Sequence, residues 1–158
     1  DRRPSLQPLS VNALVERAIE LSLGSAGAPA RPVVRDFDPE LPGTVGDVGQ
    51  LEQVILNLLA NAYQAVAGQA GTVSVRTRRE RGTIRIEVAD DGPGVAPDVR
   101  KKIFDPFFTT RPVGEGAGLG LSVAHGIVTE HEGRIWLDET AETGARFVVE
   151  LPIRGDAI

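Results

Sequence analysis

Two adjacent carboxylates, Asp90 and Asp91, stand between a strand-like run, GTIRIEVA, and the glycines of DDGPGV. A carboxylate at the end of a strand can project from the edge of a sheet into a pocket, where it accepts hydrogen bonds from an amine such as that of adenine. Gly92 and Gly94 would let the backbone pass close to a flat ligand. The motif therefore indicates a nucleotide-base site, although a tight surface turn would use the same residues.

A stripe of amides follows one side of an otherwise apolar helix that is expected over residues 48–66. It holds no lysine, arginine or glutamate and consists of Gln50, Gln53, Asn57, Asn61 and Gln64. Asn57 and Asn61 are four residues apart and point the same way. Neutral amide oxygens suit a magnesium ion that keeps waters and binds phosphates. The alternative is a stripe that simply faces water.

A second glycine cluster, GEGAGLGL, places Gly114, Gly116, Gly118 and Gly120 just before another expected helix. Successive backbone N–H groups at a helix N-terminus form an anion site, so this cluster predicts a phosphate-facing loop. No strand leads directly into it, which excludes the dinucleotide-binding fingerprint.

The segment IFDPFFTTRPVG, between the two glycine clusters, holds three of the five phenylalanines in the chain. A proline-broken segment with this many aromatics must bury them somewhere. It resembles a hinged lid anchored by Phe104 and by Phe107 or Phe108. An ordinary irregular segment packed on the core is the alternative.

The elements that must position these groups can be read from caps and periodicity. Ser10 and Asp47 are suited to cap the first two helices. Helices are expected at 11–23, 48–66 and about 119–133, and strands at 31–38, 71–78, 82–89, 134–139 and 144–152. Because helices and strands are mixed without strict βαβ alternation, the sequence predicts an α+β fold with helices layered on one sheet.

Composition excludes several classes of function. The formal net charge of -5 argues against a nucleic-acid surface, and the absence of cysteine excludes disulfides and thiolate chemistry. No apolar run is long enough to span a bilayer, and no signal peptide opens the sequence. We expect a cytoplasmic domain without direct membrane contact. The chain begins at Asp1, so we also expect it to be a fragment of a longer protein.

Four motifs in this order resemble the boxes of the ATP-binding catalytic domain of sensor histidine kinases, in the superfamily that also holds gyrase B and MutL. LEQVILNLLANAYQAV resembles the N box, DDGPGV the first glycine box, FDPFF the F box and GAGLGL the second glycine box. The resemblance covers roughly residues 10–153 and is strongest to nitrogen-regulation, NtrB-like kinases. It implies a Bergerat-type two-layer α/β sandwich, with a mixed, mainly antiparallel sheet covered on one face by helices.

The resemblance also implies roles for individual residues. Asp90 would bind the adenine amine, Asn61 would coordinate Mg²⁺ with Asn57 as its partner, and Arg111 would reach the phosphates. The implied catalytic residues are Asn57, Asn61 and Arg111. The implied nucleotide-binding residues are Asn61, Gln64, Ala65, Asp90, Gly92, Gly94, Val95, Phe104, Phe107, Thr110, Arg111, Gly116, Ala117, Gly118, Leu119, Gly120 and Leu121.

The chain departs from the family pattern at several positions. Gln64 stands where many members have lysine, and Ala145 stands where many have threonine. The phosphoacceptor is the more important absence. His131 precedes a glutamate but no proline follows, and we expect His125 to face apolar neighbours inside its helix. Both histidines are therefore expected to be structural, with the acceptor located upstream.

The function implied is transfer of the γ-phosphoryl group of ATP–Mg²⁺ to a histidine on a separate dimerisation domain, for onward transfer to the receiver domain of a response regulator. Residues 1–9 would be the linker from that upstream domain, 10–155 the catalytic domain, and 95–116 the ATP lid. No nucleic acid would be involved. A non-catalytic nucleotide-binding module is one alternative. A hydrolysing switch is another, but such ATPases use a glutamate where this chain has Asn57, and an amide cannot take a proton.

Overall fold

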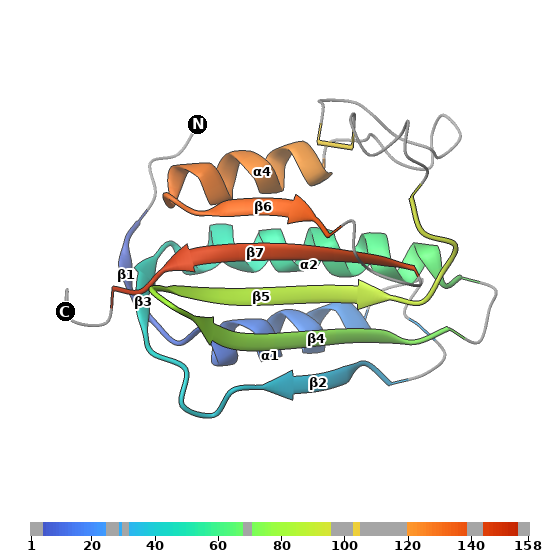
Figure 1. The fold of residues 1–158 in the computed structure, drawn as a ribbon, viewed down its shortest axis with the longest axis horizontal. Coiled ribbons are helices and arrows are strands. Elements are labelled where there is room, and N and C mark those ends of the chain that lie inside the picture. Colours follow the sequence, from blue (N-terminus) through green and yellow to red (C-terminus); the bar gives the residue numbers. More distant parts are fainter. Residues whose placement is uncertain are drawn as a thin grey trace.

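A computed structural model describes residues 5–24, 29, 32–67, 71–95, 103–104, 120–138 and 144–154. The larger sheet has five strands in the order β2-β4-β5-β7-β6 (Figure 1). Their bounds are Val34–Phe37 for β2, Val73–Glu80 for β4, Thr83–Asp90 for β5, Arg134–Leu137 for β6 and Ala145–Pro152 for β7. β2 pairs with β4 in parallel, and the other three pairs are antiparallel.

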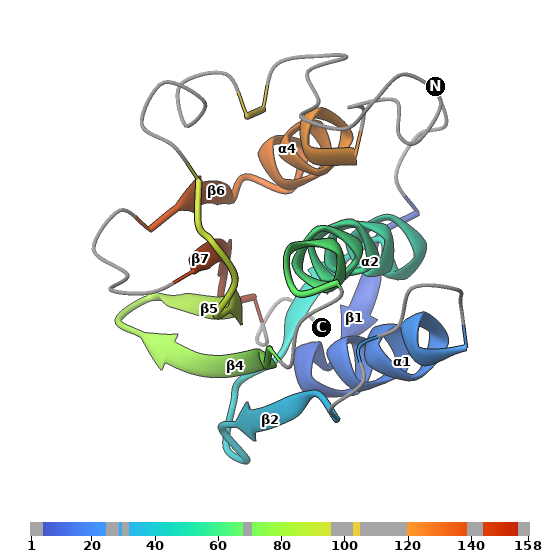
Figure 2. The same cartoon turned by 90° about the vertical axis from the view of Figure 1, so that its right-hand side faces the viewer.

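Three helices lie side by side on one face of this sheet, as Figure 2 shows. They are α1 (Val11–Leu23), α2 (Val48–Ala65) and α4 (Gly120–Glu130). The middle helix, α2, contacts both of its neighbours. The predicted fold class is confirmed: helices form one layer and a mixed, mainly antiparallel sheet forms the other.

Local signals set where these elements begin and end. The Ser10 hydroxyl accepts the Ala13 N–H at 3.3 Å, and the Asp47 carboxylate accepts the Gln50 N–H at 3.0 Å. Both predicted caps are therefore confirmed. The hairpin between β4 and β5 turns at Arg81, whose φ is 59°, followed by Gly82.

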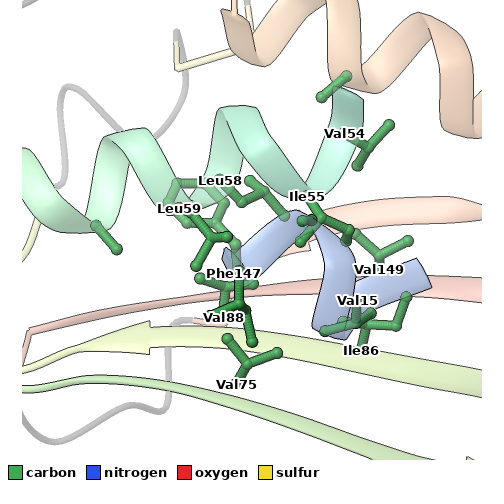
Figure 3. Close-up of a cluster of buried hydrophobic side chains, with 14 of the residues drawn as sticks. Val15, Val54, Ile55, Leu58, Leu59, Val75, Ile86, Val88, Phe147 and Val149 are labelled. Atoms are coloured by element: carbon green, nitrogen blue, oxygen red, sulfur yellow. The ribbon is translucent and has the colours of Figure 1, made fainter. Parts of the chain in front are cut away.

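The core lies between the helices and the sheet (Figure 3). Alternate strand residues such as Ile86, Val88 and Phe147 point toward the helices, where Leu58 and Leu59 of α2 are fully buried. At roughly 1.5–3 kcal/mol for each large apolar side chain removed from water, this interface supplies most of the drive to fold. It also holds α2 and β5 in a fixed relation.

On the opposite face of the sheet, Glu150 lies between two arginines. It accepts hydrogen bonds from Arg85 Nε at 3.2 Å and from Arg134 Nη2 at 3.0 Å, and both guanidinium groups lie over the Trp136 ring. Burial disfavours the charge on Glu150, but the two arginines outweigh it and hold the pKa of this carboxyl below its ordinary value. Charged side chains thus cover this face.

Two short strands were missed in the sequence. β1 (Gln7–Leu9) pairs antiparallel with β3 (Thr44–Gly46), although residues 1–9 were expected to be a linker without regular structure. Ser5 donates its N–H to the Asp47 carboxylate at 2.8 Å, and Leu9 packs on the core. Three-residue strands that pair across α1 leave no local periodicity to recognise.

Candidate functional site

Most of the predicted site residues that the structure describes lie on elements that begin or end at the same end of the molecule. The end of β5, the end of α2, the start of β7 and the start of α4 all lie at the right of Figure 1. Antiparallel pairing places Asp90, the last residue of β5, opposite Ala145, the first residue of β7. Sheet topology therefore brings together motifs that are widely separated in sequence.

Asp90 is a buried acceptor at this end of the sheet. Its side chain belongs to the helix-facing set of β5, and the residue is only 6 % exposed. Its Oδ1 accepts the Gly92 N–H at 2.9 Å. Burial raises the pKa of the Asp90 carboxyl, and the charge of Asp91 adds to this, whereas the backbone N–H groups of Gly92 and Ala145 oppose it. The ionised carboxylate keeps further acceptor positions for a donor on a ligand.

The glycines around Asp90 are required by the protein's own backbone. A Cβ on Gly92 would lie 2.6 Å from the carbonyl oxygen of Ala65, at the end of α2. Gly94 has a φ of +81°, and Gly144 has a φ of +64°. A Cβ on Gly144 would lie 1.8 Å from the carbonyl oxygen of Asp90. The fold itself therefore requires glycine at Gly92 and Gly144.

We expect Gly144→Ala to lower the free energy of unfolding by about 2–4 kcal/mol, because it combines a backbone clash with a left-handed φ. Gly126→Ala is the matched control. A Cβ at that α4 position meets nothing within 4 Å, so helix propensity predicts a gain of about 0.5–1 kcal/mol. Urea unfolding of both variants is the measurement, and equal effects at the two sites would contradict the packing argument.

The amide stripe lies along the outer side of α2. Gln53 and Gln64 are exposed, whereas Gln50, Asn57 and Asn61 are half-buried. Gln53 Nε2 donates to Asn57 Oδ1 at 2.6 Å. Within the described ranges the Asn61 amide has no hydrogen-bond partner. Asn61 lies one turn before Ala65, beside the Asp90 turn, so a ligand between them could reach both.

Phe104 anchors the only part of the predicted lid segment that the structure describes beyond Val95. Its ring lies 6.1 Å from Phe147 in an edge arrangement and 5.7 Å from His125. Ala65, Val95 and Leu121 are half-buried near the same end, and Gly120 begins α4. The other predicted lid and phosphate-loop residues lie outside the described residues: Phe107, Phe108, Thr110, Arg111, Gly114, Gly116, Ala117, Gly118 and Leu119.

The two histidines occupy different environments. His131 is 8 % exposed, with Nδ1 donating to the Ile127 carbonyl at 2.8 Å and Nε2 accepting the Asp47 N–H at 3.0 Å. Both ring nitrogens are thus engaged in a structural contact between α4 and the start of α2. His125 was expected to face apolar neighbours, and its ring lies 5.7 Å from that of Phe104, but the residue is exposed because Ala124 and Val128 occupy the inner side of α4.

Comparison with known proteins places this arrangement in a family. The sequence pattern described as "Histidine kinase-, DNA gyrase B-, and HSP90-like ATPase" matches residues 46–155, which is more than half of the chain. The chain belongs to this family. The resemblance to the ATP-binding domain of sensor histidine kinases, and the fold that it implied, are therefore confirmed.

The relatives of this family domain are sensor histidine kinases. The chain is 39% identical to the sensory histidine kinase/phosphatase NtrB of Rhodobacter capsulatus, with 96% of the chain and 45% of NtrB aligned. It is also 39% identical to the sensor histidine kinase ZraS of Escherichia coli O157:H7, over 94% of the chain and 32% of ZraS. The chain therefore spans less than half the length of these curated relatives.

Solved structures of histidine kinases share the fold of this domain. The catalytic domain of histidine kinase ThkA superposes with a TM-score of 0.80 at 28% identity, covering 98% of this chain and 99% of that one. The full-length kinase ShkA, solved in complex with AMPPNP, gives a TM-score of 0.79 at 32% identity, with 96% of this chain and 32% of ShkA aligned. The described part of this family domain contains no helix with the length and apolarity to cross a bilayer.

Sequence reasoning missed two contributors to the site. Gly144 was expected only as the first residue of the strand over 144–152, yet its backbone packs directly on Asp90. A lone glycine between a turn and a strand was the available signal. The second contributor, Asp91, bonds to the backbone of Thr72. Its partner is a main-chain group that lies 19 residues away, which no side-chain pattern could have revealed.

Proposed function

We propose that this domain binds ATP with Mg²⁺ and transfers the γ-phosphoryl group to a histidine on a separate dimerisation domain. The observation that carries the proposal is the buried Asp90 carboxylate at the end of β5, clamped beside the end of α2 in a histidine kinase-type ATPase domain. A carboxylate in this setting suits a ligand group that donates hydrogen bonds.

Adenine supplies such a donor through its exocyclic amine. An ionised carboxylate only accepts hydrogen bonds, so it complements an amine and opposes the carbonyl that guanine carries at the same position. Asp90 would therefore select adenine over guanine. Gly92 and Gly94 would lie along the base, and Val95, Phe104 and Leu121 would supply apolar contacts near it.

Magnesium would be held by amide oxygens. Among the described residues, no group of three histidine, cysteine, aspartate or glutamate side chains could hold a metal. Asn61 and Asn57 offer hard, neutral oxygens, which suit an ion that keeps waters and takes its remaining ligands from phosphates. When bound, Mg²⁺ would neutralise phosphate charge. Asn61, with no hydrogen-bond partner in the described part of the chain, would be the first ligand.

The chemistry requires positioning more than covalent participation. A nitrogen of the acceptor imidazole would attack the γ-phosphorus in line while the bond to the β–γ bridging oxygen breaks and ADP leaves. The imidazole proton would pass to solvent or to a base outside this chain, since Asn57 offers no base. Arg111, Thr110, Phe107 and the loop from Gly116 to Gly120, with Gln64 and Ala65 at the end of α2, would surround the phosphates.

The proposed transfer also requires domains outside this one. We propose that residues 10–155 form the catalytic domain, with 95–116 as its lid, and that residues 1–9, of which Gln7–Leu9 pair with β3, lead in from upstream helices carrying the acceptor histidine. A response regulator receiver domain would take the phosphoryl group onward, in the cytoplasm. ThkA has been solved in complex with the response regulator protein TrrA, which supports a response regulator as a partner.

We expect the isolated chain to bind ATP–Mg²⁺ without labelling itself. His131 is buried with both nitrogens bonded, and it lies roughly 16 Å along the helix axis from Gly120, the first residue of α4, at 1.5 Å per residue. Incubation with radiolabelled ATP, with and without the dimerisation domain in trans, tests this. Label should appear only on a histidine of the added domain. Phosphate on His125 or His131 would contradict the proposal, and binding without any transfer would favour a non-catalytic module.

A further inference from the structure

Asp91, the second carboxylate of the DDGPGV motif, ties the end of β5 to a neighbouring segment. Its Oδ1 accepts the Thr72 N–H at 2.7 Å, and its own N–H donates to the Thr72 carbonyl at 3.3 Å. Thr72 lies just before β4, and the adjoining pair Val73–Asp90 is the last rung of the β4–β5 ladder. The side chain of Asp91 therefore closes the ladder one residue beyond its end.

This contact bears directly on Asp90. On the β7 side, Gly144 packs against the Asp90 carbonyl, and the Ala145 N–H contributes to the carboxylate. On the β4 side, the Asp91–Thr72 pair adds two hydrogen bonds beyond the end of the ladder, where strand ends otherwise fray. We propose that Asp91 is a positioning residue for nucleotide recognition, which holds the Asp90 carboxylate in place through its hydrogen bond to Thr72. The inference rests on the proposed role of Asp90.

The charge of Asp91 has the opposite effect on the same site. It lies next to Asp90 and adds to the burial that raises the pKa of the Asp90 carboxyl. The nearest described charge on β7 is Arg146, which pairs with Asp138 and Glu87 on the other face of the sheet. The last turn of α2 carries no basic residue. Asp91 thus holds Asp90 in position but disfavours its ionised form.

Two substitutions separate these effects. Asp91→Asn keeps an oxygen for the Thr72 N–H and removes the charge, whereas Asp91→Ala removes both. Asp38→Ala is the control, because Asp38 makes the same kind of bond, accepting the Glu40 N–H at 2.9 Å, in the segment after β2 and away from the site. ADP binding is measured by calorimetry from neutral to acidic pH. Urea unfolding of each variant identifies any loss of fold.

At neutral pH we expect Asp91→Ala to weaken ADP binding about three- to tenfold, since one positioning hydrogen bond is lost. Asp91→Asn and Asp38→Ala should stay within about twofold of the parent. Asp90 must be ionised to accept, and removing the Asp91 charge lowers its pKa. Binding by Asp91→Asn should therefore persist to lower pH than binding by the parent. Because Asp91 is exposed, added salt should shift the parent toward the same behaviour.

Parent-like affinity in Asp91→Ala would overturn the inference, as would a pH profile of Asp91→Asn identical to that of the parent. If Asp91→Ala does not fold, Asp91→Glu takes its place, because the longer side chain keeps the charge but moves the acceptor away from the Thr72 N–H; parent-like ADP affinity in that variant would overturn the inference. ADP binding by Asp90→Asn, measured in the same experiment, separates the proposed role of Asp90 from that of Asp91. If Asp90→Asn binds ADP normally, the proposed role of Asp90 fails. If it loses binding while Asp91→Ala does not, only the role of Asp91 fails.

Discussion

Asp90→Asn is expected to weaken ATP binding by about one to two orders of magnitude while leaving the domain at least as stable as the parent. The amide would present a donor where the adenine amine needs an acceptor, and a buried mismatch of this kind costs about 1–3 kcal/mol. The asparagine oxygen can still accept the Gly92 N–H, so the turn is kept. Calorimetry gives the affinity, and urea unfolding gives the stability.

The stability difference should depend on pH with a defined sign. Burial raises the pKa of Asp90, so the folded state holds its proton more tightly than the unfolded state. The parent therefore loses stability as pH rises from the ordinary aspartate range through this raised pKa, and Asp90→Asn does not. Asp38→Asn, at a half-exposed position, is the matched control. Unchanged affinity in a folded Asp90→Asn would rule out the adenine assignment.

Asn61→Ala is expected to remove the tightening of ATP binding that Mg²⁺ produces, a loss of about tenfold or more, while metal-free binding of the adenosine part survives. The physical reason is that Asn61 would supply a protein oxygen to the ion, whereas the base contacts lie at Asp90. Titrations of ATP with and without Mg²⁺ measure the metal-dependent and the metal-free parts of the affinity separately.

Gln53→Ala serves as the control for Asn61→Ala. Gln53 belongs to the same amide stripe but is exposed and bonds to Asn57 two turns before the end of α2. It should change metal dependence far less than Asn61→Ala. If the two variants respond to Mg²⁺ alike and like the parent, the stripe is a solvated face and the metal proposal is wrong.

Local signals allowed much of the fold to be predicted. The caps at Ser10 and Asp47 and the alternation in β4 and β5 depend on neighbours in sequence, and these elements were found as expected. β1 and β3 were missed because each is three residues long and its partner lies across a helix. The exposure of His125 could not be predicted, because the rotation of the helix depends on packing against β6 and α2, which periodicity alone does not resolve.

In the site, too, local features could be predicted from the sequence and tertiary contacts could not. The position of Asp90 at a strand end could be predicted, because alternation and a following glycine turn are local features. The reason for Gly92 could not, because the carbonyl of Ala65 that it meets comes from another element. The bond from Asp91 to Thr72 is likewise invisible in sequence, since its donor is a backbone group. Residue type identifies a chemical group, whereas its partners depend on the assembled fold.

The segment matched to the family, residues 46–155, is shorter than the unit that must fold. Val15 and Ile19 of α1 are fully buried against the rest of the core, and Leu9 lines its edge together with Leu51 and Ile55. A recombinant fragment cut at residue 46 would lack α1, and the core side chains that Val15 and Ile19 cover would be exposed to water. A cut at Ser10 would keep α1 but remove Leu9 and the Ser5 bond to Asp47. An expression boundary that preserves the folded domain therefore lies ahead of Ser5.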